Sequence, residues 1–329
     1  MRRSGRIIVR GIVQGVGFRP FVYARASAYG ITGRVKNLGS EVEIFAQGDR
    51  FEEFLASVRA GPPLARIDYV AVTPWEGPYP DDFFILPSST GTLSGMVPPD
   101  IATCEECLAD IGAAGVRYEE YWATSCVNCG PRYSIITGLP YDRERTSMAQ
   151  FRTCPACSGE YGAPACRRHH AQTIACDRCG PRLTLFDRDG NEVESSNLLR
   201  ETARLLDSGA IVASRGIGGF HIACIEASAG ELKRRLGRSE QPFAVMVRDT
   251  GHVSRIAHVS VTERHLLESS IRPIVVLEKR DSTAHEKISN LHTLGCMLPY
   301  SGLHHLLFSH LVHPLLVMTS ANMPGYPMI

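Results

Sequence analysis

The sequence predicts a multidomain α+β protein with three parts: a small βαββαβ domain, two four-cysteine modules and an α/β domain. Its 329 residues exceed one compact core and predict two or three domains. Eight of the 11 cysteines form C-x-x-C pairs in the middle of the chain. The segments on either side carry strand and helix patterns without such pairs. We therefore expect domains at 1–90, 100–187 and 195–329.

Composition and charge are those of an ordinary globular protein. Hydrophobic residues make up 44% and charged residues 21% of the chain, which excludes a disordered protein. The net charge of +1 gives no overall reason to expect binding to nucleic acid or to an anionic membrane. No apolar run approaches the roughly 18 residues that span a bilayer, and no long apolar segment follows Met1, so we expect a cytoplasmic protein.

The first part, residues 1–90, alternates between strand and helix patterns. Pro20 lies near the start of one helix, Gly30 follows its end, and Asp49 is a candidate N-cap of a second helix. The dipeptide Gly39-Ser40 predicts a hairpin. The order βαββαβ predicts a ferredoxin-like antiparallel sheet with both helices on one face, and the Pro-, Gly- and Ser-rich run at 74–92 predicts its boundary. The expected strands are Arg6–Gly11, Ile31–Leu38, Glu41–Gln47 and Ile67–Val72, and the expected helices are Arg19–Tyr29 and Asp49–Ala60.

A glycine-rich turn between the first strand and the first helix predicts a phosphate-binding loop. Gly15 and Gly17 allow backbone N–H groups to converge on one point, and the helix start adds partial positive charge. Arg19 supplies a guanidinium that suits phosphate, and Asn37 on the next strand can orient a water molecule. Water attack on an activated phosphate fits these residues, although a turn without a ligand is the alternative. The loop residues are Gln14, Gly15, Val16, Gly17 and Phe18.

Four C-x-x-C pairs in residues 100–187 predict two structural zinc sites. A thiolate tetrahedron needs four sulfurs about 2.3 Å from the metal, and two C-x-x-C turns close such a site without leaving a position for water or substrate. Because no secretory signal precedes them, metal binding is favoured over disulfides or unmetallated thiols. The cysteines are Cys104, Cys107, Cys126, Cys129, Cys154, Cys157, Cys176 and Cys179.

An internal repeat indicates how these cysteines pair. The sequence CVNCGPRY at 126–133 matches CDRCGPRL at 176–183, and the same offset of 50 relates Cys104 to Cys154. The repeat favours one cage made from the first two pairs and a second made from the last two, with interleaved pairing as an alternative. The cysteines left over, which we expect to be buried thiols, are Cys166, Cys224 and Cys296.

Basic side chains beside the cysteines allow a nucleic-acid surface as an alternative role. Each C-x-x-C-G-P turn is followed by an arginine, Arg132 or Arg182. We favour a structural spacer, in which these arginines are solvated or bridge to a neighbouring domain. The other basic residues of this region are Arg167, Arg168, His169 and His170.

The third part, residues 195–329, predicts an α/β sheet. Short apolar runs alternate with helical patterns such as Leu198–Ser208. The chain stops at Ile329 shortly after a strand and a loop, and we expect it to be a fragment with an incomplete last domain. The candidate buried strands are Ala210–Ser214, Phe243–Val247, Ile274–Leu277 and Leu315–Thr319.

Two short segments of this part are candidates for nucleotide binding. The glycines that follow Arg215 permit close approach to a ligand, although a plain turn is the alternative. The sequence TSAN at 319–322 follows an apolar strand and offers a hydroxyl and an amide to phosphates. The candidate residues are Arg215, Gly218, Gly219, Arg238, Ser320 and Asn322.

The phosphate loop resembles the signature of the acylphosphatases. The resemblance rests on VQGVGFR at 13–19 and on Val35-Lys36-Asn37 in the next strand. It implies that Arg19 binds the phosphate and that Asn37 holds the hydrolytic water.

The order of the parts resembles the HypF family of carbamoyltransferases, which act in [NiFe]-hydrogenase maturation. The spacing of 18, 24 and 18 residues between cysteine pairs is the most specific feature. The resemblance implies that the third part is a YrdC-like ATP-binding domain. The other matching segments are RGIGGFH at 215–221, PFAVM at 242–246, LPYSGLHH at 298–305 and TSAN at 319–322.

This resemblance implies a relay of reactions. Carbamoyl phosphate is hydrolysed in the first domain, and the carbamate is joined to AMP from ATP in the third, where Mg²⁺ is expected to accompany ATP. A further domain, absent from this chain, passes the carbamoyl group to the C-terminal cysteine of the protein HypE for synthesis of cyanide ligands. Because carbamate is short-lived, the two sites must share an enclosed path.

Three positions depart from the family pattern. Arg215 replaces a lysine, Leu236 replaces the lysine of an Arg-Lys-x-Arg motif, and Gln241 replaces a lysine before Pro-Phe-Ala. Leu236 removes an ammonium group expected to contact phosphate, whereas Arg215 keeps the positive charge but not the geometry of a lysine. One alternative function is a zinc-dependent RNA- or protein-binding module with an inactive YrdC-like domain. Another is a tRNA threonylcarbamoyl-type enzyme, against which the first domain and the cysteine array argue.

Overall fold

The computed structural model describes residues 3–78, 80–91, 96–238 and 240–322. Its described residues divide into two compact units. The first unit comprises Met1–Asp100 and Ser125–Gly180, and the second comprises Ile101–Thr124 and Pro181–Ile329. The segment predicted as a separate cysteine domain at 100–187 is therefore divided between the units. The predicted stop at Ile329 and part of the predicted boundary at 74–92 lie outside the described residues.

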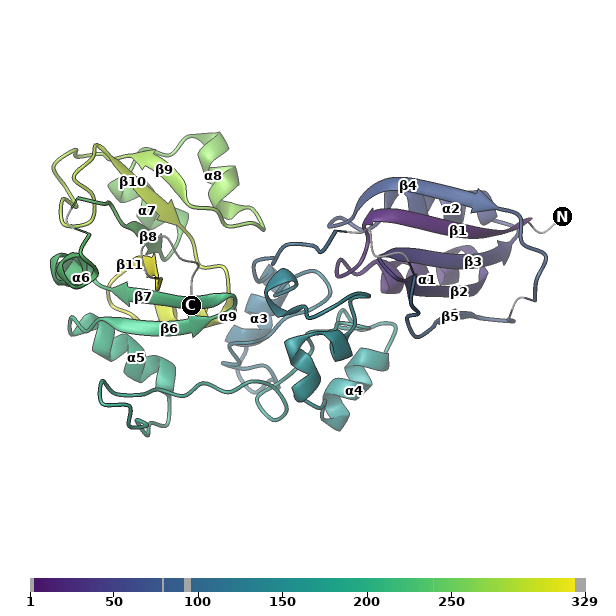
Figure 1. Ribbon diagram of the computed structural model, residues 1–329, viewed down its shortest axis with the longest axis horizontal. Helices are drawn as coiled ribbons and strands as arrows, with labels where there is room; N and C mark the ends of the chain where they lie inside the picture. Colours follow the sequence, from purple (N-terminus) through teal and green to yellow (C-terminus); the bar gives the residue numbers. More distant parts are fainter. Residues whose placement is uncertain (1–2, 79, 92–95, 239, 323–329) are drawn as a thin grey trace. The chain divides into compact units, whose positions relative to one another are not determined.

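Five strands in the described part of the first unit form one sheet, in the order β4-β1-β3-β2-β5 (Figure 1). The pairs among β1 to β4 are antiparallel, as predicted, and β2 and β3 form the predicted hairpin. Strand β5 lies in the predicted boundary segment and adds a parallel edge that the sequence analysis missed. Helices α1 and α2 contact each other and share one apolar core with the sheet. The elements are β1 (Arg3–Ile12), α1 (Phe18–Tyr29), β2 (Thr32–Leu38), β3 (Glu41–Gly48), α2 (Phe51–Ala60), β4 (Arg66–Thr73) and β5 (Phe83–Ile85).

Glycines set both ends of α1. Gly17 precedes the helix with φ of 73° and Gly30 follows it with φ of 64°, the left-handed region that favours glycine. The predicted N-cap of α2 at Asp49 is wrong. Arg50 takes the cap position without a side-chain cap bond, and Asp49 lies one residue earlier, in the turn that follows β3. Acidic residues in the first turn of α2 favour the helix dipole instead.

The cysteine repeat is also a repeat of backbone structure. Helices α3 (Glu105–Gly112) and α4 (Pro155–Gly162) each begin directly after the first cysteine of their module. Later in each module, Glu120 and His170 occupy equivalent positions with φ of 50° and 55°. The duplicated sequence therefore folds twice in the same way. Between the modules lie the short helices η1 (Tyr133–Ile135), η2 (Arg143–Arg145) and η3 (Ser147–Gln150).

The second unit contains a sheet covered on both faces, as predicted for an α/β arrangement. In its described part six strands run in the order β6-β7-β11-β8-β10-β9 (Figure 1). Along β8, Val245 and Val247 pack with α6, α7 and α8, whereas Met246 packs with α5 and α9 on the other face. The elements are α5 (Leu198–Asp207), β6 (Val212–Gly216), β7 (Gly219–Cys224), η4 (Glu226–Ser228), α6 (Ala229–Leu236), β8 (Ala244–Val247), α7 (Thr250–Ile256), α8 (Val261–Glu268), β9 (Val275–Glu278), β10 (Thr293–Met297), α9 (Gly302–His310) and β11 (Leu315–Ser320).

Two strands of this sheet were not predicted, and one was assigned the wrong environment. The sequence analysis missed β7 and β10, whose polar and small residues interrupt the apolar pattern. Strand β9 was expected to be buried, but it lies at an edge and leaves Val276 65% exposed. None of the helices in the described residues is long and apolar enough to cross a membrane.

The three unpaired cysteines differ in environment. Cys224 and Cys296 are fully buried, as predicted, and burial raises the pKa of their thiols to about 11 and about 12. Cys166 is partly exposed, so the prediction of a buried thiol is wrong at this position. It belongs to neither of the two groups of four cysteines.

Candidate phosphate site and metal centres

The glycine-rich turn between β1 and α1 leaves backbone donors available to a ligand. Gly15 and Gly17 have φ of 69° and 73°, which turns the chain sharply into the helix. Among the described residues, no acceptor takes a hydrogen bond from the backbone N–H groups of Gln14, Gly15, Val16 or Gly17. Adjacent N–H groups of this kind, beside a helix start, form a concave site for an anion.

Arg19 and Asn37 line the same pocket as this loop. Arg19 lies in the first turn of α1 and is buried, and its Nη1 donates to Ser88 Oγ at 3.3 Å. Asn37 on β2 is only 1% exposed, and no donor among the described residues reaches its Oδ1. A buried amide oxygen without a protein partner is costly, so a water molecule or ligand is expected to bind it.

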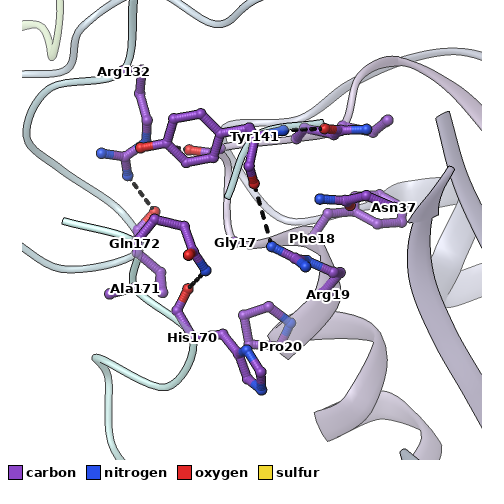
Figure 2. A pocket seen from close by; sticks show the side chains of 14 residues that line it. Gly17, Phe18, Arg19, Pro20, Asn37, Arg132, Tyr141, His170, Ala171 and Gln172 are labelled. Atoms are coloured by element: carbon purple, nitrogen blue, oxygen red, sulfur yellow. Dashed lines mark hydrogen bonds between the residues drawn. The ribbon is translucent and has the colours of Figure 1, made fainter. Parts of the chain in front are cut away.

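The pocket has about 30 Å³ of free space, enough for one or two water molecules. Figure 2 shows the side chains that line it. Its wall comes partly from the cysteine region, which the sequence analysis did not connect with the loop. The turn signature revealed the loop, but no local pattern reveals residues that approach it from more than 100 positions away. The lining residues are Val13, Gln14, Gly15, Gly17, Phe18, Arg19, Pro20, Asn37, Val127, Arg132, Tyr141, His170, Ala171 and Gln172.

The Gln14 side chain fixes one side of this wall. Its Nε2 donates to the carbonyl oxygens of Gly39 and Glu41, each at 3.0 Å, and its Oε1 accepts the N–H of Tyr141 at 2.9 Å. The side chain therefore braces the pocket, and only the backbone of Gln14 is available to an anion. Burial raises the pKa of Tyr141, so its hydroxyl stays protonated at neutral pH.

Arg132 fixes the other side of the glycine turn. Its guanidinium is buried and donates to the carbonyl oxygens of Gly15, Val127 at 2.9 Å and Cys129 at 3.0 Å. The sequence analysis predicts that Arg132 and the repeat-related Arg182 are solvated or bridge to a neighbouring domain. Arg182 is exposed, and Arg132 contacts Gly15 in the segment predicted as the first domain.

The basic run at 167–170 does not form an exposed surface. Arg168 and His169 are buried, and Arg168 Nε donates to the carbonyl oxygen of Ser125 at 3.1 Å. His170 lines the pocket, where burial, together with the charges of Arg19 and His169, lowers its pKa to about 4. At neutral pH the imidazole of His170 is uncharged, which argues against this run as a nucleic-acid site.

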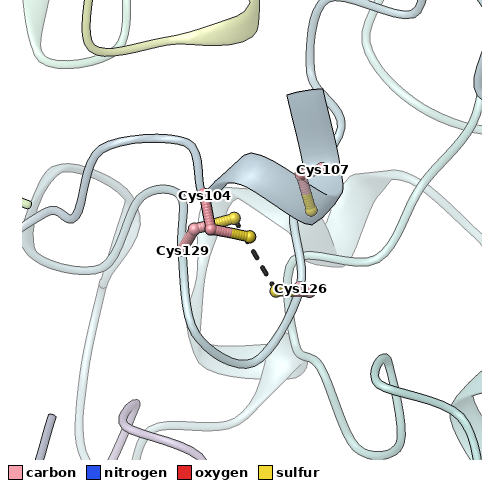
Figure 3. A group of neighbouring side chains, drawn as sticks. All are labelled: Cys104, Cys107, Cys126 and Cys129. Atoms are coloured by element: carbon pink, nitrogen blue, oxygen red, sulfur yellow. Dashed lines mark hydrogen bonds between the residues drawn. The ribbon is translucent and has the colours of Figure 1, made fainter. Parts of the chain in front are cut away.

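The paired cysteines form two groups, as the repeat predicts. In each group the four sulfur atoms lie within 4.8 Å of one another, and Figure 3 shows the first group. A tetrahedron with metal–sulfur bonds of about 2.3 Å has edges of about 3.8 Å. The Sγ atoms of Cys126 and Cys129, and those of Cys154 and Cys176, are 3.8 Å apart. Both groups therefore have the donor set and spacing of a structural zinc site.

The predicted nucleotide residues of the second unit fall into two groups. Gly216 and Gly219 pair across a tight hairpin between β6 and β7, so the glycine segment forms the turn of this hairpin. The Arg215 guanidinium lies over the Phe220 ring, 5.7 Å from its centre. Gly218 lies in the turn itself.

The second group gathers at the end of β11. Arg238 Nη1 donates to Thr319 Oγ1 at 3.2 Å, and Ser320 Oγ donates to Asn322 Oδ1 at 2.7 Å. Leu236, in place of the expected lysine, packs against the apolar core. A nucleotide-binding role for both groups stays a prediction.

Comparison with known families recovers all three predicted resemblances. The acylphosphatase family matches residues 5–85. The HypF finger family matches residues 103–136 and 153–186. The Sua5/YciO/YrdC family, described as telomere recombination, matches residues 204–329.

Similarity to single proteins extends along nearly the whole chain. A probable carbamoyltransferase HypF of Methanocaldococcus jannaschii is 47% identical over 98% of this chain. The carbamoyltransferase HypF of Rhodobacter capsulatus is 45% identical over 99% of it. The chain belongs to the HypF family. A crystal structure of full-length HypF in its phosphate- and nucleotide-bound form matches 100% of this chain, with a TM-score of 0.92 and 38% identity.

The match covers only part of these HypF proteins. The chain spans about 44% of the length of the Methanocaldococcus and Rhodobacter relatives, and 44% of the crystallised HypF chain. A free-standing acylphosphatase of Caldivirga maquilingensis is 51% identical over 22% of this chain and 80% of its own length. The first part of the chain is therefore similar both to HypF proteins and to an acylphosphatase.

Proposed function

We propose that this chain hydrolyses an acyl phosphate at the pocket of the first unit, and that its natural substrate is carbamoyl phosphate. Four observations support the proposal: the unpaired N–H groups of the loop, the buried Arg19, the open Oδ1 of Asn37 and the family match. The loop with its free N–H groups carries the argument, because it gives a phosphate several donors at once.

In the proposed reaction the loop and Arg19 hold the phosphoryl oxygens, and Asn37 Oδ1 accepts a hydrogen bond from the attacking water. The water oxygen bonds to phosphorus as the bond from phosphorus to the acyl oxygen breaks. Carbamate leaves with that oxygen, phosphorus takes up the hydroxyl of the water, and the other proton of the water passes to a phosphoryl oxygen. The chain supplies position and charge without forming a covalent intermediate.

Phosphate release from carbamoyl phosphate or acetyl phosphate tests this proposal. Arg19→Ala should lower kcat/KM by at least about 10³-fold, because it removes the side-chain cation that holds the phosphate. Asn37→Ala should lower kcat by about 10²-fold while leaving phosphate binding intact. Arg25→Ala on the exposed face of α1 is the matched control and should keep wild-type turnover. Wild-type turnover equal to the spontaneous rate would refute the proposal.

The remaining roles follow from the HypF relatives and are part of the same proposal. The two cysteine groups would bind one structural Zn²⁺ each. The second unit would bind ATP with Mg²⁺ through the six predicted nucleotide residues and join the carbamate to AMP. HypE would accept the carbamoyl group in the cytoplasm after a transfer step by a further domain. The three predicted parts, 1–90, 100–187 and 195–329, would be the functional divisions.

The alternative of an RNA-binding module receives little support from the described structure. Its basic residues Arg168 and His169 are buried, and Arg132 is used inside the fold. Salt-sensitive binding of RNA without any phosphate release would favour that alternative over hydrolysis.

A further inference from the structure

A carboxylate already binds the guanidinium that the proposed function assigns to phosphate. Asp142 Oδ1 accepts a hydrogen bond from Arg19 Nη2 at 2.8 Å, and the same nitrogen approaches the carbonyl oxygen of Tyr141 at 3.5 Å. The Arg19 side chain is 10% exposed and that of Asp142 is 23% exposed. This ion pair is therefore largely shielded from water. Charges in such a shielded position interact more strongly than charges on an open surface.

The backbone on both sides of Asp142 is fixed by hydrogen bonds. Before it, the N–H of Tyr141 donates to Gln14 Oε1 at 2.9 Å, which ties the segment to the phosphate loop. After it, the N–H of Arg143 donates to Gln172 Oε1 at 2.8 Å. The Arg143 guanidinium also donates to the carbonyl oxygens of Gln172 and Ile174, each at 2.8 Å. Asp142 is thus held at Arg19 by the fold and is not a free surface carboxylate.

A fixed carboxylate at this position has two opposing effects on a bound phosphate. It orients the guanidinium, because one of its nitrogens is held by the ion pair while Ser88 accepts from the other at 3.3 Å. It also repels an anion and takes up part of the donor capacity of Arg19. Of the two residues of the pair, Arg19 lines the pocket, so a phosphate bound there shares the Arg19 guanidinium with the carboxylate of Asp142.

We propose that Asp142 is a positioning residue that orients Arg19 and weakens the binding of phosphate, so that the product leaves the site. This inference rests on the proposed function for its role in turnover, but the effect on phosphate affinity can be measured without turnover. The carboxylate comes from the segment between the two cysteine modules, which gives that segment a part in the chemistry beyond support.

Binding of inorganic phosphate to the full chain, measured by calorimetry, tests the inference. Asp142→Asn keeps the shape and the acceptor oxygen but removes the charge, and should tighten phosphate binding by about tenfold. Asp142→Glu keeps the charge and should stay within about threefold of wild type. Asp142→Ser, a smaller neutral variant, should also tighten phosphate binding. It provides a second test of charge removal if the Asp142→Asn variant does not fold. In hydrolysis assays Asp142→Asn should lower KM and strengthen inhibition by phosphate, whereas loss of a merely structural contact would raise KM.

The outcomes separate this inference from the proposed function. Unchanged or weaker phosphate binding in both neutral variants, with Arg19→Ala abolishing it, would overturn the inference and leave hydrolysis standing. Tighter binding in the neutral variants without any turnover in wild type would support the inference and refute the proposed function. Phosphate binding too weak to detect in wild type but measurable in Asp142→Asn would also support the inference, and failure to detect it in both would overturn it.

Discussion

The two cysteine modules have the same backbone plan and different surroundings. In the first module Glu120 accepts a hydrogen bond from Asn197 Nδ2 at 3.1 Å. In the second module the equivalent residue, His170, lines the phosphate pocket with its neighbours Ala171 and Gln172. Both residues have the same left-handed backbone, so the repeat has one backbone conformation at this position and its two side chains make different contacts.

The arginines that end the two modules differ in the same way. Arg132 is 2% exposed and binds several backbone carbonyl oxygens, including that of Gly15 in the phosphate loop. Arg182 follows the same C-x-x-C-G-P turn and is exposed. Identical local sequence therefore does not give identical roles, because the role depends on what lies opposite the turn.

The largest effect should come from breaking either cage. Cys107→Ser and Cys157→Ser should each reduce bound zinc from two ions to one and unfold the module concerned, because structural zinc contributes about 10–16 kcal/mol in isolated zinc-finger peptides. Cys166→Ser is the matched control, since this thiol lies outside both cages. Metal analysis and thermal unfolding give the readouts. Two ions retained in Cys157→Ser would contradict the assigned cage.

A smaller difference should separate the two arginines. Arg132→Ala leaves several buried carbonyl oxygens without a donor and should cost about 3 kcal/mol of unfolding free energy, together with slower hydrolysis. Arg182→Ala should change that free energy by less than about 0.5 kcal/mol. Denaturant titration of the two variants measures the contrast. Equal losses of unfolding free energy in the two variants would contradict the different roles assigned to Arg132 and Arg182.

The smallest effect should be a pH dependence contributed by His170. Its pKa is lowered to about 4 in the fold, so between about pH 6.5 and 4 the unfolded chain binds the proton more readily. The stability that this group contributes is thus present above its unfolded pKa and is lost as the pH falls. Between pH 7 and pH 5, His170→Gln should therefore lose on the order of 1 kcal/mol less unfolding free energy than wild type, because His170 is partly exposed and its contribution is reduced accordingly. The difference in unfolding free energy between variant and wild type at pH 7 and pH 5 measures it, and a constant difference would contradict the assignment.

Local patterns predicted most of the elements but not the environment of every one. The βαββαβ order, the hairpin at Gly39-Ser40 and the cysteine pairing depend on short-range signals, namely alternation, turn residues and spacing, and the structure has all three. Strand β5 was missed because its three residues lie in a run of turn formers. Strand β9 was predicted to be buried because its residues are apolar, although an edge strand leaves one face open.

By itself, the sequence determined the sharp turn before α1, because Gly15 and Gly17 adopt a backbone that few other residues tolerate. It also determined the two cysteine groups, because thiolates at that spacing can share one metal. Only the tertiary structure decided that Asp142 binds Arg19, and that His170 and Arg132 line the same pocket, from more than 100 residues away. Those contacts depend on how separate elements pack together, and such packing produces no periodic pattern in the sequence from which it could be predicted.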